Sequence, residues 1–312
     1  MRADKITTMI ELSVKDETAP LNAVILGRAD SFGGTPTLEE AYDPKSKEHI
    51  LNGTFPLEQD LLPEMESVLE ILEKHGVQVF RPDPIRDCNQ VFARDIGFVI
   101  DDKLVIPNIL PDRKIEQSGL DTIIKQIHPE KIYRAPVGAR LEGGDVMPWK
   151  GKLFVGYSEQ KDFDTYRVSR TNVAGIEFLK KSFPHYEIHA FELNKSDDQA
   201  MNNALHLDCC FQPIGHNQAI IYKGGFKNEK DYQFLINYFG RENCIEITKE
   251  EMYRMFSNVF SISTEVIISE KGFSRLNDEL RLRGFQVEEV PYAEVSKMEG
   301  LLRCSTLPLH RS

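Results

Sequence analysis

Four short stretches of the sequence carry residue types suited to covalent chemistry on a cationic substrate. They are Arg94-Asp95, Glu142-Gly143-Gly144-Asp145, His206-Leu207-Asp208 and the lone Cys304. Taken singly, each has an ordinary explanation, because a cysteine is most often a small buried apolar group, an Arg-Asp pair is usually solvated and a Gly-Gly run usually marks a turn. Their complementary chemistry makes the combination informative.

The combination suits a substrate that carries a guanidinium group. A guanidinium stays protonated and presents planar forks of N–H donors, so its site favours two carboxylates, each taking a bidentate pair. Asp95 and Asp208 are the candidates. The central carbon is a weak electrophile, so attack on it calls for a soft nucleophile such as the thiolate of Cys304. We expect His206 to act as the acid and base, with Glu142 hydrogen-bonded to its far ring nitrogen.

The elements that must position these motifs follow a pattern that returns five times. Each unit reads as strand, strand, helix, strand, at a spacing of about 50 to 60 residues, which is typical of closed propeller-like arrays. The units open with LNAVILGRAD, RDIGFVIDDKLVIPNIL, GGDVMPWKGKLFVGYSE, HLDCCFQPIGHNQAIIYKG and FSNVFSISTEVIIS. Because one unit cannot bury its own sheet, we expect an α/β fold of five ββαβ-type blades around a pseudo-fivefold axis.

Closure of such an array brings the starts of successive units together at the axis. The first three motifs lie at the starts of units two to four, and Cys304 follows the last strand. Side chains two apart on a strand point the same way, so we expect His206 and Asp208 to face one space. Residues 21–312 are predicted to form a single catalytic domain, with residues 1–20 as an N-terminal extension.

Composition limits the partners. The chain has 312 residues, a net charge of −11 and 28% charged residues, which argues against nucleic acid or an anionic membrane surface and suits a cationic small molecule. No apolar run approaches the ~18 residues that span a bilayer, and the N-terminus lacks an apolar signal core, so we expect a cytoplasmic protein. The five cysteines contain no C-x-x-C pair, which favours reduced thiols with neither a metal site nor a cofactor. The sequence leaves a homo-oligomer open.

The order Arg-Asp, Glu-Gly-Gly-Asp, His-x-Asp, Cys resembles that of the guanidino-group-modifying enzymes with the pentein fold. These include arginine deiminases, dimethylarginine dimethylaminohydrolases and amidinotransferases, and the similarity extends from about residue 22 to residue 311. The resemblance implies that the two aspartates hold the guanidinium and that Glu142 and His206 form the acid/base pair. It also implies that Cys304 carries a covalent thiouronium-type intermediate.

The resemblance extends less firmly to three other regions. Arg170, in RVSRTN, resembles the arginine that receives the substrate carboxylate in the deiminases, with Arg140 and Arg303 as alternatives. The glycine-rich run before the nucleophile is reduced here to MEGLL, residues 298–302. Residues 31–53 read as a long irregular connection, which is either a lid or a simple surface insertion.

Three functions are compatible with these residues. We favour hydrolysis, in which water attacks the amidino-thioether and releases a ureido, citrulline-type product, because no segment stands out as a barrier to water. An amidinotransferase, in which an acceptor amine takes the amidino group, would use the same residues. A non-catalytic binding protein on this fold would not need a cysteine, a histidine and three carboxylates in register. The identity of the guanidine substrate stays open.

Overall fold

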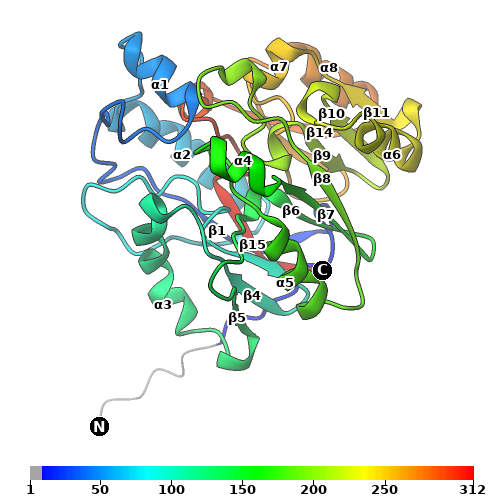
Figure 1. Ribbon diagram of the computed structural model, residues 1–312, viewed down its shortest axis with the longest axis horizontal. Coiled ribbons are helices and arrows are strands. Elements are labelled where there is room, and N and C mark those ends of the chain that lie inside the picture. Colours follow the sequence, from blue (N-terminus) through cyan, green and yellow to red (C-terminus); the bar gives the residue numbers. More distant parts are fainter. Residues whose placement is uncertain (1–8) are drawn as a thin grey trace.

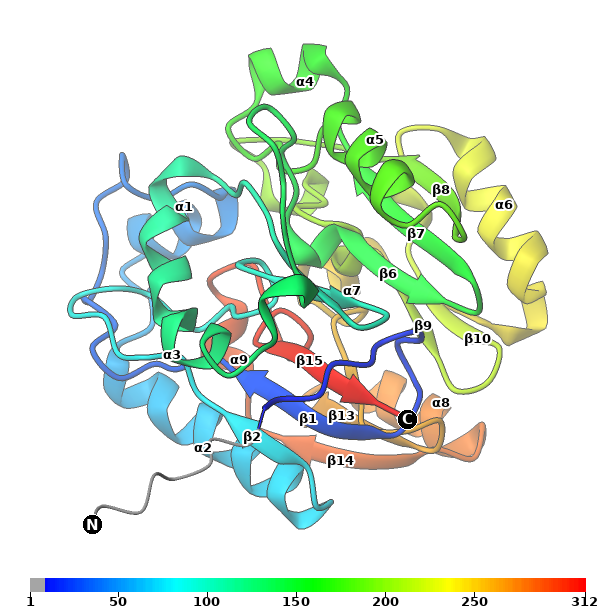
Figure 2. The ribbon, with the colours of Figure 1, turned by 90° about the horizontal axis from the view of Figure 1, so that it is seen from below.

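The computed structural model describes residues 9–312 and contains five three-stranded sheets, the blades, arranged around a common centre (Figures 1 and 2). In every blade the first and second strands are antiparallel, and the second and third are parallel. The blades are formed by β15 (Thr306–Arg311), β1 (Leu21–Leu26) and β2 (Gln78–Phe80); β3 (Phe98–Ile100), β4 (Lys103–Ile106) and β5 (Ile132–Arg134); β6 (Val146–Trp149), β7 (Lys152–Tyr157) and β8 (Glu187–Glu192); β9 (Phe211–Ile214), β10 (Gln218–Ile221) and β11 (Cys244–Glu246); and β12 (Phe260–Ser261), β13 (Val266–Glu270) and β14 (Gln286–Val290). The predicted five-bladed α/β propeller is confirmed.

A helical crossover joins the second strand of each blade to the third, since parallel neighbours cannot be joined by a tight turn. The crossover helices are α2 (Glu58–Lys74), α3 (Asp121–Ile124), α5 (Val173–Ser182), α6 (Glu229–Phe239) and α8 (Ser274–Leu282). The other helices are α1 (Pro44–Leu51), α4 (Gln160–Thr165), α7 (Lys249–Tyr253) and α9 (Ala293–Ser296). The second crossover is mainly a 3₁₀ helix, Pro111–Leu120, which leads into the short α3.

The ring is closed by β15, which supplies the first strand of the blade that contains β1 and β2 (Figure 2). Leu26 of β1 pairs with Thr306 of β15 in an antiparallel register. Cys304 was expected to follow the last strand, but β15 comes after it. Pro308 obscured this strand, yet β15 is an edge strand of its sheet, where a missing N–H donor is tolerated.

The described part of the expected N-terminal extension packs onto the propeller. Leu12 and Val14 are buried, and the N–H of Val14 donates to the carbonyl of Asp101 at 2.7 Å. The carboxylate of Glu17 reaches the interior, where it accepts hydrogen bonds from Arg303 at 3.1 Å. The domain boundary at residue 20 stays a prediction.

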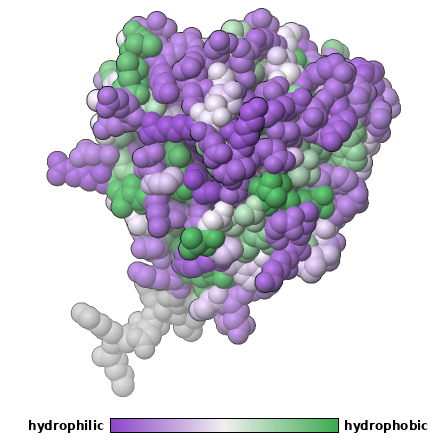
Figure 3. Space-filling model, viewed as in Figure 1, coloured by the Kyte–Doolittle hydropathy of each residue, from purple (hydrophilic) through white to green (hydrophobic). Residues whose placement is uncertain are grey.

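The hydrophobic core lies between neighbouring blades rather than in one layer. One cluster, for example, packs Trp149 and Phe154 of the β6–β8 blade against Phe211 and the α6 residue Phe239. The face seen in Figure 3 is mainly hydrophilic, with small separate hydrophobic areas. Within residues 9–312, no helix combines the length and apolar character needed to cross a membrane.

Candidate active site

The predicted site residues lie in the short turns that lead into the first strands of successive blades. Asp95 comes just before β3, Glu142 before β6, Asp208 before β9 and Cys304 before β15. These turns meet at the centre of the ring because each blade points its first strand toward the axis. All six candidates, including Arg170, are at most 2% exposed.

The geometry around His206 and Asp208 differs from the expected strand. Residues Leu207–Cys209 form a 3₁₀ turn, with His206 as its N-cap. With about three residues per turn, side chains two positions apart leave such a helix in different directions. His206 therefore contacts Glu142, whereas Asp208 contacts Arg303 and Cys304. The expected shared strand was therefore wrong, and the expectation that both side chains face the substrate stays a prediction.

The two glycines of the Glu-Gly-Gly-Asp motif allow close contact between blades. A Cβ added to Gly143 would lie 2.1 Å from the carbonyl oxygen of Arg94, and one added to Gly144 would lie 2.7 Å from Cγ of His206. Neither glycine is among the positive-φ residues, so close approach rather than turn conformation requires them. Asp145 then holds the next turn, because its Oδ1 accepts from the N–H of Leu207 at 2.9 Å.

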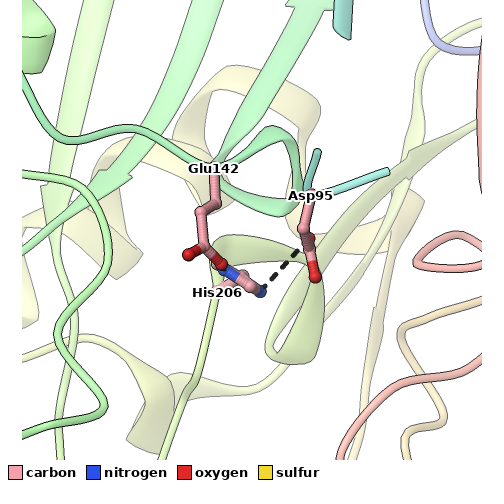
Figure 4. Close-up of side chains that lie close together, drawn as sticks. All are labelled: Asp95, Glu142 and His206. Atoms are coloured by element: carbon pink, nitrogen blue, oxygen red, sulfur yellow. Dashed lines mark hydrogen bonds and ion pairs between the residues drawn. The ribbon is translucent and has the colours of Figure 1, made fainter. Parts of the chain in front are cut away.

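Asp95, Glu142 and His206 form a compact group (Figure 4). Nε2 of His206 lies 2.9 Å from Oε2 of Glu142, and Nδ1 lies 3.8 Å from Oδ1 of Asp95. Burial alone would raise the pKa of Glu142, but Arg170 and His206 hold it well below its usual range, so Nε2 is the donor to an ionised carboxylate. Burial lowers the pKa of His206, and Asp95 and Glu142 outweigh that effect and raise it above the usual value.

Cys304 lies beside the second predicted carboxylate. Its Sγ is 3.6 Å from Oδ2 of Asp208. Burial, followed by the charges of Asp208 and Asp95, raises the pKa of the Cys304 thiol well above its ordinary value. The thiol is therefore protonated at neutral pH, and a cation placed between these carboxylates would favour the thiolate.

Both predicted guanidinium-binding carboxylates contact guanidinium groups of the chain itself. Arg113 donates to Oδ2 of Asp95 at 2.7 Å, and Arg303 donates to Oδ2 of Asp208 at 2.8 Å. Each aspartate thus has one oxygen, Oδ1, free of an arginine, and the expected bidentate contact with a substrate is not available in this arrangement. Sequence reasoning missed Arg113 because its i,i+3 spacing from Glu116 reads as an ordinary surface ion pair.

The three arginines considered for a substrate carboxylate lie in different surroundings. Arg303 is fully buried and its donors are used by Glu17, Asp208 and main-chain carbonyls. Arg140 is half-buried, with its guanidinium over the ring of Phe163. Arg170 is fully buried, and its Nε lies 3.4 Å from Oε2 of Glu142. Among the three, Arg170 therefore combines proximity to the acid/base pair with donors that are not saturated by carboxylates.

Residues 31–53, which we call the cover segment, lie over these groups. The segment is not wholly irregular, because it contains α1, capped by Asp43. The Tyr42 ring lies over the guanidinium groups of Arg113 and Arg170, at 5.8 and 5.9 Å from its centroid. The carbonyl of Tyr42 also accepts a hydrogen bond from Arg170.

Tyr42 also lines a cavity of about 750 Å³. Its lining includes Tyr42, Phe92, Glu116 and the half-buried Cys88, but none of the six candidate residues. Because Tyr42 contacts both the cavity and the two arginines, the cavity adjoins the catalytic group through the cover segment.

The other cysteines have structural surroundings. Cys209 and Cys210 are buried in hydrophobic clusters, as expected from their apolar neighbours. Cys244 is also buried. None of the three lines the cavity.

Asp95, Glu142 and His206 offer donor atoms within 4.8 Å of one another, a spacing that would suit a metal ion. Their carboxylates, however, already lie beside cations. Arg113 is 2.7 Å from Asp95, and Arg170 is 3.4 Å from Glu142. Since these guanidinium groups would repel a divalent ion, we assign the group no metal-binding role.

Comparison with known proteins finds relatives that match most of the chain. The family described as "N,N dimethylarginine dimethylhydrolase, eukaryotic" matches residues 48–311. The uncharacterized protein YkgA of Bacillus subtilis (strain 168) is 32% identical over 248 residues, 78% of each chain. The N(G),N(G)-dimethylarginine dimethylaminohydrolase of Pseudomonas aeruginosa is 24% identical over 195 residues, covering 62% of this chain and 66% of that protein. The structure of SxtG, an amidinotransferase from Microseira wollei, aligns with a TM-score of 0.73 and 18% identity over 96% of this chain and 97% of the other.

The fold and the family match together identify the chain as a guanidino-modifying enzyme of the pentein superfamily. Within that superfamily, the chain belongs to the N,N dimethylarginine dimethylhydrolase family, because the family match covers most of its length.

Proposed function

We propose that this enzyme hydrolyses a C–N bond of an arginine-like guanidine, with Cys304 as the nucleophile, and releases an amine or ammonia and a ureido product. The observation that carries the proposal is the environment of His206. Its Nε2 is fixed by Glu142, whereas within residues 9–312 neither its Nδ1 nor Oδ1 of Asp95 has a hydrogen-bond partner. An acid/base group and a carboxylate oxygen are thus both available to a substrate.

The first half of the reaction starts from a protonated Cys304. A guanidinium bound at the free oxygens of Asp95 and Asp208 would offset the two charges that raise the thiol pKa. The thiol then loses its proton to solvent, and the sulfur attacks the guanidinium carbon to form a tetrahedral adduct. His206 gives its Nδ1 proton to the departing amine, the C–N bond breaks and an amidino-thioether remains.

The second half uses the neutral His206 as a base. Nδ1 takes a proton from water, and the hydroxide attacks the same carbon. The C–S bond then breaks, the proton on the product oxygen passes to the departing sulfur, and the neutral ureido product and the Cys304 thiol result. Glu142 stays ionised throughout and stabilises the imidazolium whenever it forms.

The other end of the substrate would lie toward the cavity. Arg170, with Arg113 beside it, places guanidinium donors between the catalytic group and Tyr42. We therefore propose Arg170 as the anchor for a substrate carboxylate. This assignment favours amino-acid guanidines, including N-methylated arginines, over guanidines that lack an acidic group.

A second function, transfer of the amidino group to an acceptor amine, is favoured by one observation. The cover segment and the burial of all six candidates provide the exclusion of water that a transferase requires and that the sequence did not reveal. The fold is also shared with an amidinotransferase. Hydrolysis remains the proposal because the activation of water needs only one basic group, and the unpartnered Nδ1 of His206 supplies it.

Product analysis in oxygen-18 water tests the proposal. Arginine, monomethylarginine and dimethylarginine would be incubated with the enzyme, with and without millimolar glycine, and products identified by mass spectrometry. We expect citrulline carrying one heavy oxygen, in unchanged yield with glycine. Ornithine with guanidinoacetate as the main products would instead establish the transferase, and turnover by Cys304→Ala would exclude the covalent mechanism.

A further inference from the structure

The five-bladed repeat raises a question about the blade formed by β12, β13 and β14. The other four blades each contribute a site residue from the turn before their first strand. The corresponding turn of this blade holds Asn258, two residues before β12. Asn258 is fully buried, although nothing in its sequence context marks it as functional.

Asn258 contacts the nucleophile on two sides. Its Oδ1 accepts a hydrogen bond from the main-chain N–H of Cys304 at 3.2 Å, and its Nδ2 lies 3.2 Å from Sγ. The orientation of the amide follows from these contacts, because a main-chain N–H can only donate and must face the oxygen. Nδ2 is therefore the group that faces sulfur. The main-chain carbonyl of Asn258 also accepts a hydrogen bond from the N–H of Arg303, the residue before Cys304, and so holds the main chain there in place.

The charges around Cys304 give this contact its importance. Asp208 and Asp95 both disfavour the thiolate, as does burial. Two hydrogen bonds oppose these effects and lower the thiol pKa, one with the main chain at Leu301 and one with the side chain of Asn258, whose Nδ2 lies 3.2 Å from Sγ. A donor that faces a buried sulfur stabilises the anion more than the neutral thiol.

We infer that Asn258 is a catalytic residue of this enzyme, supplied by the fifth blade, which positions Cys304 and stabilises its thiolate by donating a hydrogen bond from Nδ2 to Sγ. The same bond would serve twice in each turnover, when the thiolate attacks and when it leaves. The inference rests on the proposed function only in taking Cys304 as the nucleophile, and its test does not require turnover.

The test compares Asn258→Asp with the wild-type enzyme. An aspartate keeps an oxygen to accept from the N–H of Cys304, but it replaces the donor to sulfur by a second acceptor. Alkylation of Cys304 by iodoacetamide would be followed peptide by peptide with mass spectrometry between pH 6 and 10, and kcat and KM would be measured alongside. We expect the alkylation profile to move to higher pH and the rate at pH 7.5 to fall about tenfold to a hundredfold, with kcat falling more than KM changes.

Asn277→Asp is the matched control. Asn277 is a buried asparagine of α8 in the same blade, and its side chain bonds to Ser269 and to the carbonyl of Glu270 rather than to Cys304. It should leave the alkylation profile of Cys304 unchanged. An equal shift in this control would show that the effect is structural and would overturn the assignment.

Two further variants keep the inference testable if Asn258→Asp does not fold. Asn258→Ser retains a donor and Asn258→Ala does not, so the serine variant should alkylate at lower pH than the alanine variant. Identical profiles in the two variants, or a wild-type profile in Asn258→Asp, would overturn the inference. Turnover by Cys304→Ala would refute the proposed function while leaving the alkylation result unaffected.

Discussion

The catalytic interior and the cover segment lie against each other but are held by different means. In the interior, side chains from separate blades contact one another, as His206 does with Glu142 and Arg303 with Asp208. The cover segment is held by hydrogen bonds that its main chain accepts from Arg167 and, at Tyr42, from Arg170, and by side chains such as Lys45, which donates to the carbonyl of Tyr253. Function in the interior thus depends on the identity of each residue. The position of the cover segment depends mainly on the residues outside it to which it is hydrogen-bonded.

The largest effect should come from the nucleophile. Cys304→Ala removes the covalent step, so kcat should fall at least ~1,000-fold while the protein still binds its substrate. Steady-state kinetics and calorimetric binding would be measured on the same preparation. A kcat above roughly a tenth of the wild-type value, a barrier difference of less than about 1.4 kcal/mol, would exclude this role.

A buried charge of the interior should dominate stability. Burial would raise the pKa of Glu17, but Arg303 and Arg94 outweigh it and hold the value at about 2, against an ordinary value of 4.5. The stabilisation from this lowered pKa is complete above about pH 4.5 and is lost as the pH falls toward 2. Glu17→Gln should therefore lower the free energy of unfolding on the order of 3 kcal/mol at pH 7, with a smaller difference in acid.

Urea unfolding at pH 7 and at pH 3.5 measures this difference. Glu70→Gln, on the exposed face of α2, is the control and should have no such effect. A pH-independent difference between Glu17→Gln and wild type would contradict the electrostatic explanation.

Removal of one substrate carboxylate should reduce catalysis without unfolding the interior. In Asp95→Asn, Arg113 keeps both of its 2.8 Å hydrogen bonds to Glu116, so the fold should tolerate the change. We expect kcat/KM to fall about 100-fold because a charged acceptor becomes neutral and the pKa of His206 loses a contribution that raises it. Asp121→Asn, an exposed aspartate of α3 that does not line the cavity, should retain activity; comparable losses in both variants would place the binding carboxylate elsewhere.

The smallest effect should come from the cover segment. Tyr42→Ala removes the ring over Arg113 and Arg170, and KM should rise roughly threefold to tenfold with little change in kcat. Tyr42→Phe keeps the ring and should behave like the wild type. If Tyr42→Ala instead lowered kcat as strongly as an interior variant, the distinction between the two regions would not hold.

The same distinction explains what the sequence could predict. The repeated strand order and the motifs before β3, β6 and β9 are local patterns, so the five blades were predicted and the candidate residues of the site could be proposed from the sequence. Arg113 was missed because it pairs with Asp95, which lies in another turn, and the sequence around Arg113 does not indicate this contact. Asn258 was missed because an asparagine between Ser257 and Val259 has no local signature, although the pseudo-fivefold repeat itself pointed to that position.

The cover segment shows a signal that was present but not used. Asp43 followed by Pro44 is a typical N-cap and first helical position, and together they begin α1. Its placement over the site, in contrast, depends on distant partners such as Arg167, and the composition of residues 31–53 contains no information about them. The loss of glycine from the MEGLL run also depends on a distant partner. Glu299 adopts a φ of 58°, a conformation that glycine adopts more easily, and its side chain accepts a hydrogen bond from Asn203 at 2.6 Å.

The pairing of β15 with β1 has a consequence for folding kinetics. The strand that follows the proposed nucleophile, Cys304, joins the two ends of the described chain, so the thiol reaches Asp208 only when the ring closes. Pairing of strands so distant in sequence is intrinsically slow, because the entropy of a very large loop must be lost before any contact forms. During refolding from denaturant, catalytic activity should therefore return with the slowest phase, after the helical signal of the individual blades has recovered.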